Sequence, residues 1–252
     1  MDTLLVEQRG AWLKLTLNRP EARNALNTAL LARLAQVLEE CAAAGDCRAV
    51  LICGAGGNFA AGADIGEIES KGRGAGETDP RKEHWARIRA FPKPLVAAVD
   101  GFALGGGFEL ALLADCLILG ATARLGLPET NLGIIPGAGG GQRLLARVGY
   151  GRAARLVLTG EIIDAATAHA WGIAGWLVEG SALAEAEAIA AKLAARAPLA
   201  LATAKAALLA GETRVLALAE ERAGFEALLD SADKAEGIRA YREKRRPEFR
   251  GK

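Results

Sequence analysis

A short stretch near the middle of the chain holds the residues with the clearest chemical potential. In "GFALGGGFELALLADC", residues 101–116, three glycines at 105–107 are followed by one carboxylate, Glu109, in an apolar run. Glycine lets a backbone approach a ligand closely, and the first turn of a helix has N–H groups without intrahelical partners. The pattern predicts hydrogen-bond donors for an oxygen that gains negative charge, with Glu109 nearby. The structural alternative is a turn where glycine only permits close packing and Glu109 is a solvated acid.

Other chemistry that glycine or serine could support is not favoured. A phosphate-binding P-loop needs a Gly-Lys-Ser/Thr ending, but the only Gly-Lys is at 251–252. The runs "GAGGNF" from residue 54 and "GAGGGQ" from residue 137 lack the final Gly or Ala of a dinucleotide fingerprint. None of the three serines lies in a G-x-S-x-G motif. A dinucleotide-dependent oxidoreductase is therefore only an outside alternative.

The surrounding sequence predicts alternating strands and helices. Residues 12–17 alternate apolar and polar side chains, as a half-buried strand does, and short apolar runs at 48–53, 93–101 and 115–120 indicate buried strands. Residues 28–45 have apolar side chains at helical spacing. This alternation predicts an α/β fold with right-handed crossovers. The Gly-rich segment 71–80 is expected to be an exposed, mobile loop.

The composition of the sequence changes after residue 181. The rest is alanine-rich, has helical spacing and lacks strand signals, with breaks at Gly211 and at Ala197-Pro198. We expect an α/β core over residues 1–195 and a helical C-terminal segment over residues 196–252. Such helices need another surface to cover, which could be the core or a second subunit.

The composition argues against several classes of function. Hydrophobic residues make up 51% of the 252 residues, enough for a sizeable core, and the net charge of +1 argues against nucleic acid as a partner. No apolar run approaches the roughly 18 residues of a membrane span, and the first residues lack a signal-peptide pattern. We therefore expect a cytoplasmic protein. The four cysteines form no CxxC pair and only two histidines are present, so we expect buried, reduced thiols and no metal site.

Three further stretches, taken with residues 101–116, carry a family resemblance. They are "LNRPEARNALN" (17–27), "NFAAGADIGEI" (58–68) and "ARLGLPETNLGIIPGAGGGQRL" (123–144). In this order, over nearly the whole chain, the sequence resembles the enoyl-CoA hydratase/isomerase, or crotonase, superfamily. The resemblance implies a spiral of ββα units with a helical C-terminal trimerisation segment, assembled as a homotrimer or a dimer of trimers. It also implies an acyl-CoA substrate, with coenzyme A as its carrier part and no separate cofactor.

The resemblance assigns roles to four groups. The N–H groups of Ala61 and Gly106 are expected to bind the thioester oxygen, while Glu109 and Glu129 carry out hydration. Water must add to Cβ and a proton must reach Cα, so an enolate-like charge builds on that oxygen. Two close acids in an apolar pocket do not both ionise easily, which lets one act as base and one as acid. We expect Glu109 to activate water and Glu129 to protonate Cα.

The resemblance also implies residues for coenzyme A and for the acyl chain. Candidates for coenzyme A are Arg23, Ala61, Ala63, Asp64 and Ile65. The basic C-terminal end could contact phosphates or be a solvated end; its cations are Arg239, Arg242, Lys244, Arg245, Arg246, Arg250 and Lys252.

Within the family, the sequence looks closest to the phenylacetate-pathway hydratases, which act on 2,3-dehydroadipyl-CoA. The second carboxylate of that substrate would suit a cation in the acyl pocket. The region of Arg81, Lys82, Arg87 and Arg89 could supply it, or could be a solvated helix face. A general short-chain hydratase, a double-bond isomerase of the same fold and a non-catalytic RNA- or protein-binding module are the alternatives.

Overall fold

A six-stranded sheet forms the centre of the fold. The computed structural model describes residues 2–212, 215–245 and 247–248. The strand order is β1-β2-β3-β4-β6-β9, and all neighbours are parallel except the antiparallel pair β1 and β2. The strands are β1 (Leu4–Arg9), β2 (Trp12–Leu17), β3 (Ala49–Gly54), β4 (Leu95–Val99), β6 (Cys116–Leu119) and β9 (Trp176–Leu177). The four strands expected from the sequence are thus confirmed.

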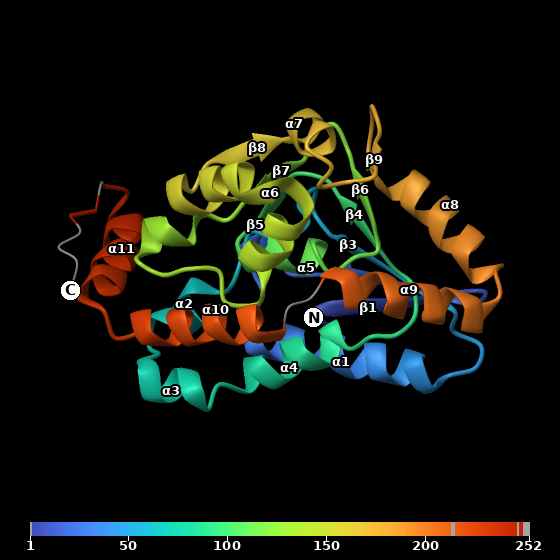
Figure 1. The fold of residues 1–252 in the computed structure, drawn as a ribbon, viewed down its shortest axis with the longest axis horizontal. Coiled ribbons are helices and arrows are strands. Elements are labelled where there is room, and N and C mark those ends of the chain that lie inside the picture. The colour runs from blue at the N-terminus through green and yellow to red at the C-terminus, as the bar shows by residue number, and fades with distance from the viewer. Residues whose placement is uncertain (1, 213–214, 246, 249–252) are drawn as a thin grey trace.

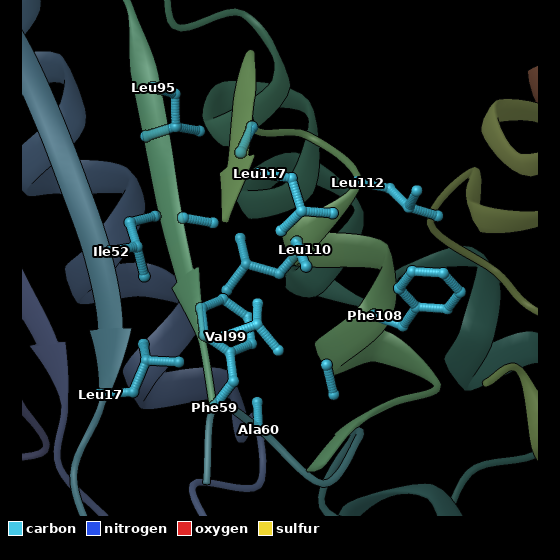
Figure 2. Packing of buried hydrophobic residues seen from close by; sticks show 14 of the residues in the cluster. Leu17, Ile52, Phe59, Ala60, Leu95, Val99, Phe108, Leu110, Leu112 and Leu117 are labelled. Carbon is cyan, nitrogen blue, oxygen red and sulfur yellow. The ribbon is translucent and has the colours of Figure 1, made fainter. Parts of the chain in front are cut away.

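The central strands are buried on both faces, which explains their continuous apolar sequence. Successive side chains of a strand point to opposite faces. On β3, Val50 and Ile52 therefore join the main core, while Leu51 and Cys53 pack with the helix α8 (Leu183–Ala194). Figure 2 shows part of the main core, where side chains from the sheet, such as Leu117 of β6, lie beside Leu110 of the helix α5 (Gly106–Ala111).

A second, three-stranded sheet carries the segments that lead into the site. It consists of β5 (Phe102–Leu104), β7 (Arg124–Gly126) and β8 (Ile162–Asp164), in the order β5-β7-β8. β5 and β7 are parallel, so their carboxyl ends lie at the same edge. An isolated bridge between Ala60 and Ala103 places the 58–63 segment beside β5. Three segments distant in sequence therefore meet at one edge.

Helices surround the two sheets, and the last of them fold back on the body. Figure 1 shows α10 (Val215–Leu228) alongside α3 (Arg73–Glu77). It also shows α11 (Ala232–Glu243) at one end of the molecule, and α11 packs against the 3-10 helix η2 (Pro128–Leu132). The helices other than α8 are α1 (Thr28–Ala43), α2 (Ile65–Glu69), α3 (Arg73–Glu77), α4 (Pro80–Arg89), α5 (Gly106–Ala111), α6 (Gly140–Thr159), α7 (Ala165–Ala170), α9 (Pro198–Glu212), α10 (Val215–Leu228) and α11 (Ala232–Glu243). The helical C-terminal segment is confirmed. Its role in trimerisation and the division near residue 195 stay predictions.

The Gly-rich segment 71–80 differs from expectation. It contains α3 and the start of α4 rather than one exposed loop. A Cβ on Gly76 would lie 2.4 Å from Leu229 Cδ1, so this glycine lets α3 approach the end of α10 closely. Two side chains of the segment, Lys71 and Asp79, line the cavity described below. The prediction of a loop was therefore wrong for residues 73–77, which form α3, while five residues of the segment are exposed as expected and its mobility stays a prediction.

Two of the four cysteines form a disulfide, which corrects the expectation of reduced thiols throughout. Cys41 lies in the last turn of α1 and Cys47 just before β3, and the connecting turn brings their Cα atoms to 5.5 Å. That separation is within the range a disulfide spans. Cys53 and Cys116 are free, as predicted, and burial raises the pKa of both thiols, that of Cys116 to about 11.

Candidate active site

Gly105 links β5 to α5, and the next two glycines are the first residues of α5; the sequence needs glycine in this run for separate reasons. Gly105 has φ of +49°, a conformation that other residues rarely adopt. A Cβ on Gly107 would lie 2.1 Å from the carbonyl oxygen of Ala60. The turn therefore passes directly against the 58–63 segment, and close packing accounts for part of the glycine run.

We expect Gly107→Ala to destabilise the fold. The added methyl group meets backbone rather than a movable side chain, so overpacking should lower the free energy of unfolding by about 1–3 kcal/mol or more. Urea unfolding measures the change. Gly151→Ala is the matched control, because Gly151 lies in α6 with nothing within 4 Å of an added Cβ. Equal stability of the two variants would contradict the close approach at Gly107.

The second backbone donor differs from the one expected. The N–H of Ala61 donates to the carbonyl oxygen of Arg23 at 2.9 Å, so it cannot also bind a thioester oxygen. Ala63 lies nearer to Gly106, since a Cβ on Gly106 would be 3.5 Å from the Ala63 nitrogen. The N–H groups of Ala63 and Gly106 both lack an acceptor among the residues that the structure describes. Ala63 therefore replaces Ala61 as the candidate donor.

Local pairing explains why Ala63 is left with a usable N–H group. Leu26 donates its N–H to the Gly62 carbonyl at 2.8 Å, and its carbonyl accepts the N–H of Asp64 at 3.1 Å. In this parallel bridge, Leu26 bonds to the residues on either side of Ala63. The N–H group of Ala63 itself therefore points away from Leu26. The sequence motif places the loop correctly, but only this bridge shows which of its amides is unused.

Glu109 lies in the first turn of α5 and is held by a second glycine run. Its Oε1 atom accepts hydrogen bonds from the N–H groups of Ala138 at 2.8 Å and Gly140 at 2.9 Å. A Cβ on Gly140 would lie 2.7 Å from Glu109 Cγ, so glycine is required for this approach. Residues 137–141, which fail as a dinucleotide motif, therefore position the acid. The run itself was the only sequence signal for this role.

The surroundings of Glu109 act on its pKa in opposite directions. The side chain is 4% exposed, and burial raises its pKa. The N–H groups of Gly140 and Ala138 oppose this rise, and the positive charges of Arg143 and Arg81 do so more weakly. Because burial dominates, Glu109 should exchange protons at a higher pH than an ordinary glutamate.

Glu129 reaches the same place from η2. It follows Pro128, which begins that helix, and it is 9% exposed. Its Oε1 atom would lie 3.1 Å from a Cβ on Gly105, so it packs against the glycine turn. Ala63, Gly106, Glu109 and Glu129 all line one cavity of about 320 Å³. The structure thus brings the two predicted acids together with both candidate donors.

The residues expected to bind coenzyme A separate into two groups. Ala61, Ala63 and Ile65 line the cavity. The Asp64 carboxylate instead accepts the N–H of Gly66 at the start of α2 and pairs with Arg19 at 3.0 Å. The Arg23 guanidinium lies over the Phe102 ring, 5.7 Å from its centroid. Asp64 and Arg23 therefore have structural contacts, and their contact with coenzyme A stays a prediction.

The basic C-terminal end is partly engaged within the chain. Arg239 and Arg245 pair with Glu236, and Arg242 pairs with Glu69. Arg246, Arg250 and Lys252 lie outside the described residues. These ion pairs join α11 to Arg245, which lies just beyond its end, and to the end of α2. A phosphate-binding role of the C-terminal end stays a prediction.

The described part of the chain has neither a clustered set of metal ligands nor a membrane-spanning helix. It contains no group of three or more His, Cys, Asp or Glu side chains that could hold a metal ion. Of its helices, none has both the length and the apolar character to cross a membrane.

Two buried carboxyl groups and two backbone N–H donors around one cavity define an enzyme site for proton transfer beside a carbonyl whose oxygen becomes charged. The chain belongs to the enoyl-CoA hydratase/isomerase family, whose sequence profile matches residues 7–252. It is an enzyme of this family and has the α/β crotonase fold.

Individual relatives match over their full length. The 2,3-dehydroadipyl-CoA hydratase of Escherichia coli (strain K12) is 46% identical over 255 residues, covering 100% of both chains. A probable enoyl-CoA hydratase of Rhizobium meliloti (strain 1021) is 41% identical over 99% of this chain and 98% of its own. The crystal structure of an enoyl-CoA hydratase/isomerase from Pseudoalteromonas atlantica T6c superimposes with a TM-score of 0.91 at 32% identity, covering 99% of this chain and 100% of that one.

Proposed function

We propose that this enzyme adds water reversibly across the double bond of trans-2-enoyl-CoA thioesters to give 3-hydroxyacyl-CoA. The observation that supports this most is the pair of buried acids, Glu109 and Glu129, in the cavity that also contains the Ala63 and Gly106 N–H groups. An isomerase can work with one acid, so the pair favours hydration. The same intact site speaks against a non-catalytic RNA- or protein-binding module.

The geometry suggests how the groups divide the reaction. The N–H groups of Ala63 and Gly106 donate to the thioester oxygen as it gains charge; one such donor is typically worth about 2.7–4 kcal/mol of barrier lowering. Glu109, fixed through Oε1, accepts a proton from the water that attacks Cβ. Glu129 delivers a proton to Cα, and the two acids exchange roles in dehydration.

For the acyl chain, we propose 2,3-dehydroadipyl-CoA as a substrate. The 2,3-dehydroadipyl-CoA hydratase of Escherichia coli is similar over the whole chain. Within residues 81–89, Arg81 contributes a cation to the cavity. Family membership also leads us to propose a homotrimer or a dimer of trimers, located in the cytoplasm. Arg87 of this region pairs with Glu39 and Lys82 with Glu226, and neither lines the cavity.

A panel of trans-2-enoyl-CoAs, with and without a terminal carboxylate, tests the proposed activity. We expect loss of the ultraviolet absorbance of the conjugated thioester and a 3-hydroxyacyl-CoA product. Interconversion of 3-enoyl-CoA and 2-enoyl-CoA without hydration would support the isomerase instead. An RNA shift that weakens with salt, without any hydration, would support the binding module.

A further inference from the structure

The cavity is also lined by charged side chains from α4 and its neighbours, and most of these charges are already paired. The Lys71 ammonium donates to Asp79 Oδ2 at 2.7 Å. Arg222 donates through Nε to Glu226 Oε1 at 2.8 Å and through Nη2 to the Gly76 carbonyl at 3.3 Å. These two cavity-lining cations therefore have carboxylate partners within the protein.

Arg81 is different from these two cations. Its side chain is 9% exposed and lines the cavity, yet its guanidinium makes no hydrogen bond to the described residues. The carboxylate paired with it, that of Glu67, lies 3.8 Å away. A guanidinium has five N–H donors, and burying such groups without acceptors costs free energy. Arg81 therefore has unused donor capacity directed at the contents of the cavity or its solvent.

The neighbouring carboxylates are held by other donors. Glu67 already accepts from the Thr28 N–H at 2.9 Å and from the Thr28 hydroxyl at 2.7 Å. Asp79 accepts from Lys71 and from the backbone N–H of Arg81 at 3.0 Å. The acids in this region are thus engaged elsewhere, and their positions are fixed by those bonds.

The distances between opposite charges also set Arg81 apart. Lys71, Lys82 and Arg222 each have a carboxylate oxygen within 2.8 Å. For Arg81 the carboxylate paired with it, that of Glu67, is 3.8 Å away. An added carboxylate would give Arg81 the close acidic partner that the other three cations have.

Other parts of the cavity wall suit a hydrocarbon chain. Its wall includes the apolar side chains of Ile65, Ile68, Trp85, Phe225 and Leu229. We infer that Arg81 recognises a carboxylate at the far end of the acyl chain and so selects dicarboxylic enoyl-CoA over uncharged chains. This inference rests on the proposed function and assigns its substrate selectivity to one residue. Arginine suits the task because its planar fork can donate two parallel hydrogen bonds to a carboxylate.

Arg81→Met tests the assignment with two substrates of equal chain length. We expect kcat/KM for 2,3-dehydroadipyl-CoA to fall roughly 10- to 100-fold, since a charge-assisted hydrogen bond is lost. For trans-2-hexenoyl-CoA we expect a change within about threefold, because methionine keeps the apolar stem. Arg87→Met is the matched control: it lies on the same helix but pairs with Glu39, and it should alter neither value.

The outcomes separate recognition from other roles of Arg81. An equal fall for both substrates would show that Arg81 acts through Glu109 or through the fold, and would overturn the assignment. A wild-type enzyme that hydrates both substrates equally well would also overturn it, yet would leave the proposed hydration intact. Hydration of neither would instead contradict the proposed function.

A binding measurement keeps the test decisive if Arg81→Met does not fold, as judged by thermal unfolding. Arg81→Lys keeps the charge but not the fork, and should weaken binding of unreactive adipyl-CoA while leaving hexanoyl-CoA unchanged in calorimetry. Equal affinity of the wild-type enzyme for the two saturated thioesters would contradict recognition of the terminal carboxylate. A preference for adipyl-CoA that Arg81→Lys reduces would support it.

Discussion

Glu109→Gln should lower kcat for enoyl-CoA hydration by about 10²- to 10⁴-fold, the usual contribution of a positioned general base. Glutamine can still accept the Ala138 and Gly140 hydrogen bonds, so the fold and acyl-CoA binding should persist. Stopped-flow absorbance gives kcat, and calorimetry with a saturated acyl-CoA gives the affinity. Glu40→Gln, at a side chain that is 58% exposed, is the control. Near-normal turnover of Glu109→Gln would remove this residue from the mechanism.

The same substitution should stabilise the protein at neutral pH. Burial raises the pKa of Glu109 in the folded state, so ionising it there costs more than in the unfolded chain. The wild type therefore loses stability as pH rises from the unfolded-state pKa, about 4.3, through the folded-state pKa. Denaturant unfolding should show Glu109→Gln to be more stable than wild type near neutrality, with the difference shrinking toward acid pH. A constant difference across this range would contradict the raised pKa.

Glu129→Gln should also lower kcat by about 10²- to 10⁴-fold, but through a different step. Without an acid at this position, no proton reaches Cα, while the oxygen is still held by the Ala63 and Gly106 N–H groups. Exchange of the α-protons of a saturated acyl-CoA in heavy water, followed by NMR, isolates this step. We expect exchange with wild type and with Glu109→Gln, and none with Glu129→Gln. Exchange lost only in Glu109→Gln would reverse the two roles.

The sequence was sufficient to predict the architecture and to select both candidate acids, whose catalytic roles stay predictions, because both leave local patterns. Buried strands such as residues 49–54 have continuous apolar runs, and the glycine turn at 105–107 with Glu109 is a compact motif. The acids lie in one cavity because η2 and α5 follow β7 and β5, two parallel neighbours whose carboxyl ends share an edge. Such convergence follows from topology, which the alternating strands and helices indicate.

Other features depend on contacts that sequence patterns do not reveal. The use of the Ala61 N–H by Arg23, rather than by substrate, arises from a bond between loops distant in sequence. The glycines of 137–141 resemble a failed nucleotide motif until Glu109 is seen against them. The Cys41–Cys47 disulfide depends on how the chain turns after α1. In each case a three-dimensional approach between segments decides the role of a residue whose type alone is ambiguous.

A crystal structure with an unreactive acyl-CoA tests the central claim most directly. The thioester oxygen should lie about 2.7–3.1 Å from the nitrogens of both Ala63 and Gly106, with the Glu109 and Glu129 carboxyl groups flanking the adjacent Cα and Cβ atoms. Contradiction would be an oxygen bound to neither amide, or to Ala61 after loss of its bond to Arg23. An acyl chain that leaves the cavity shared by the two glutamates would contradict it equally.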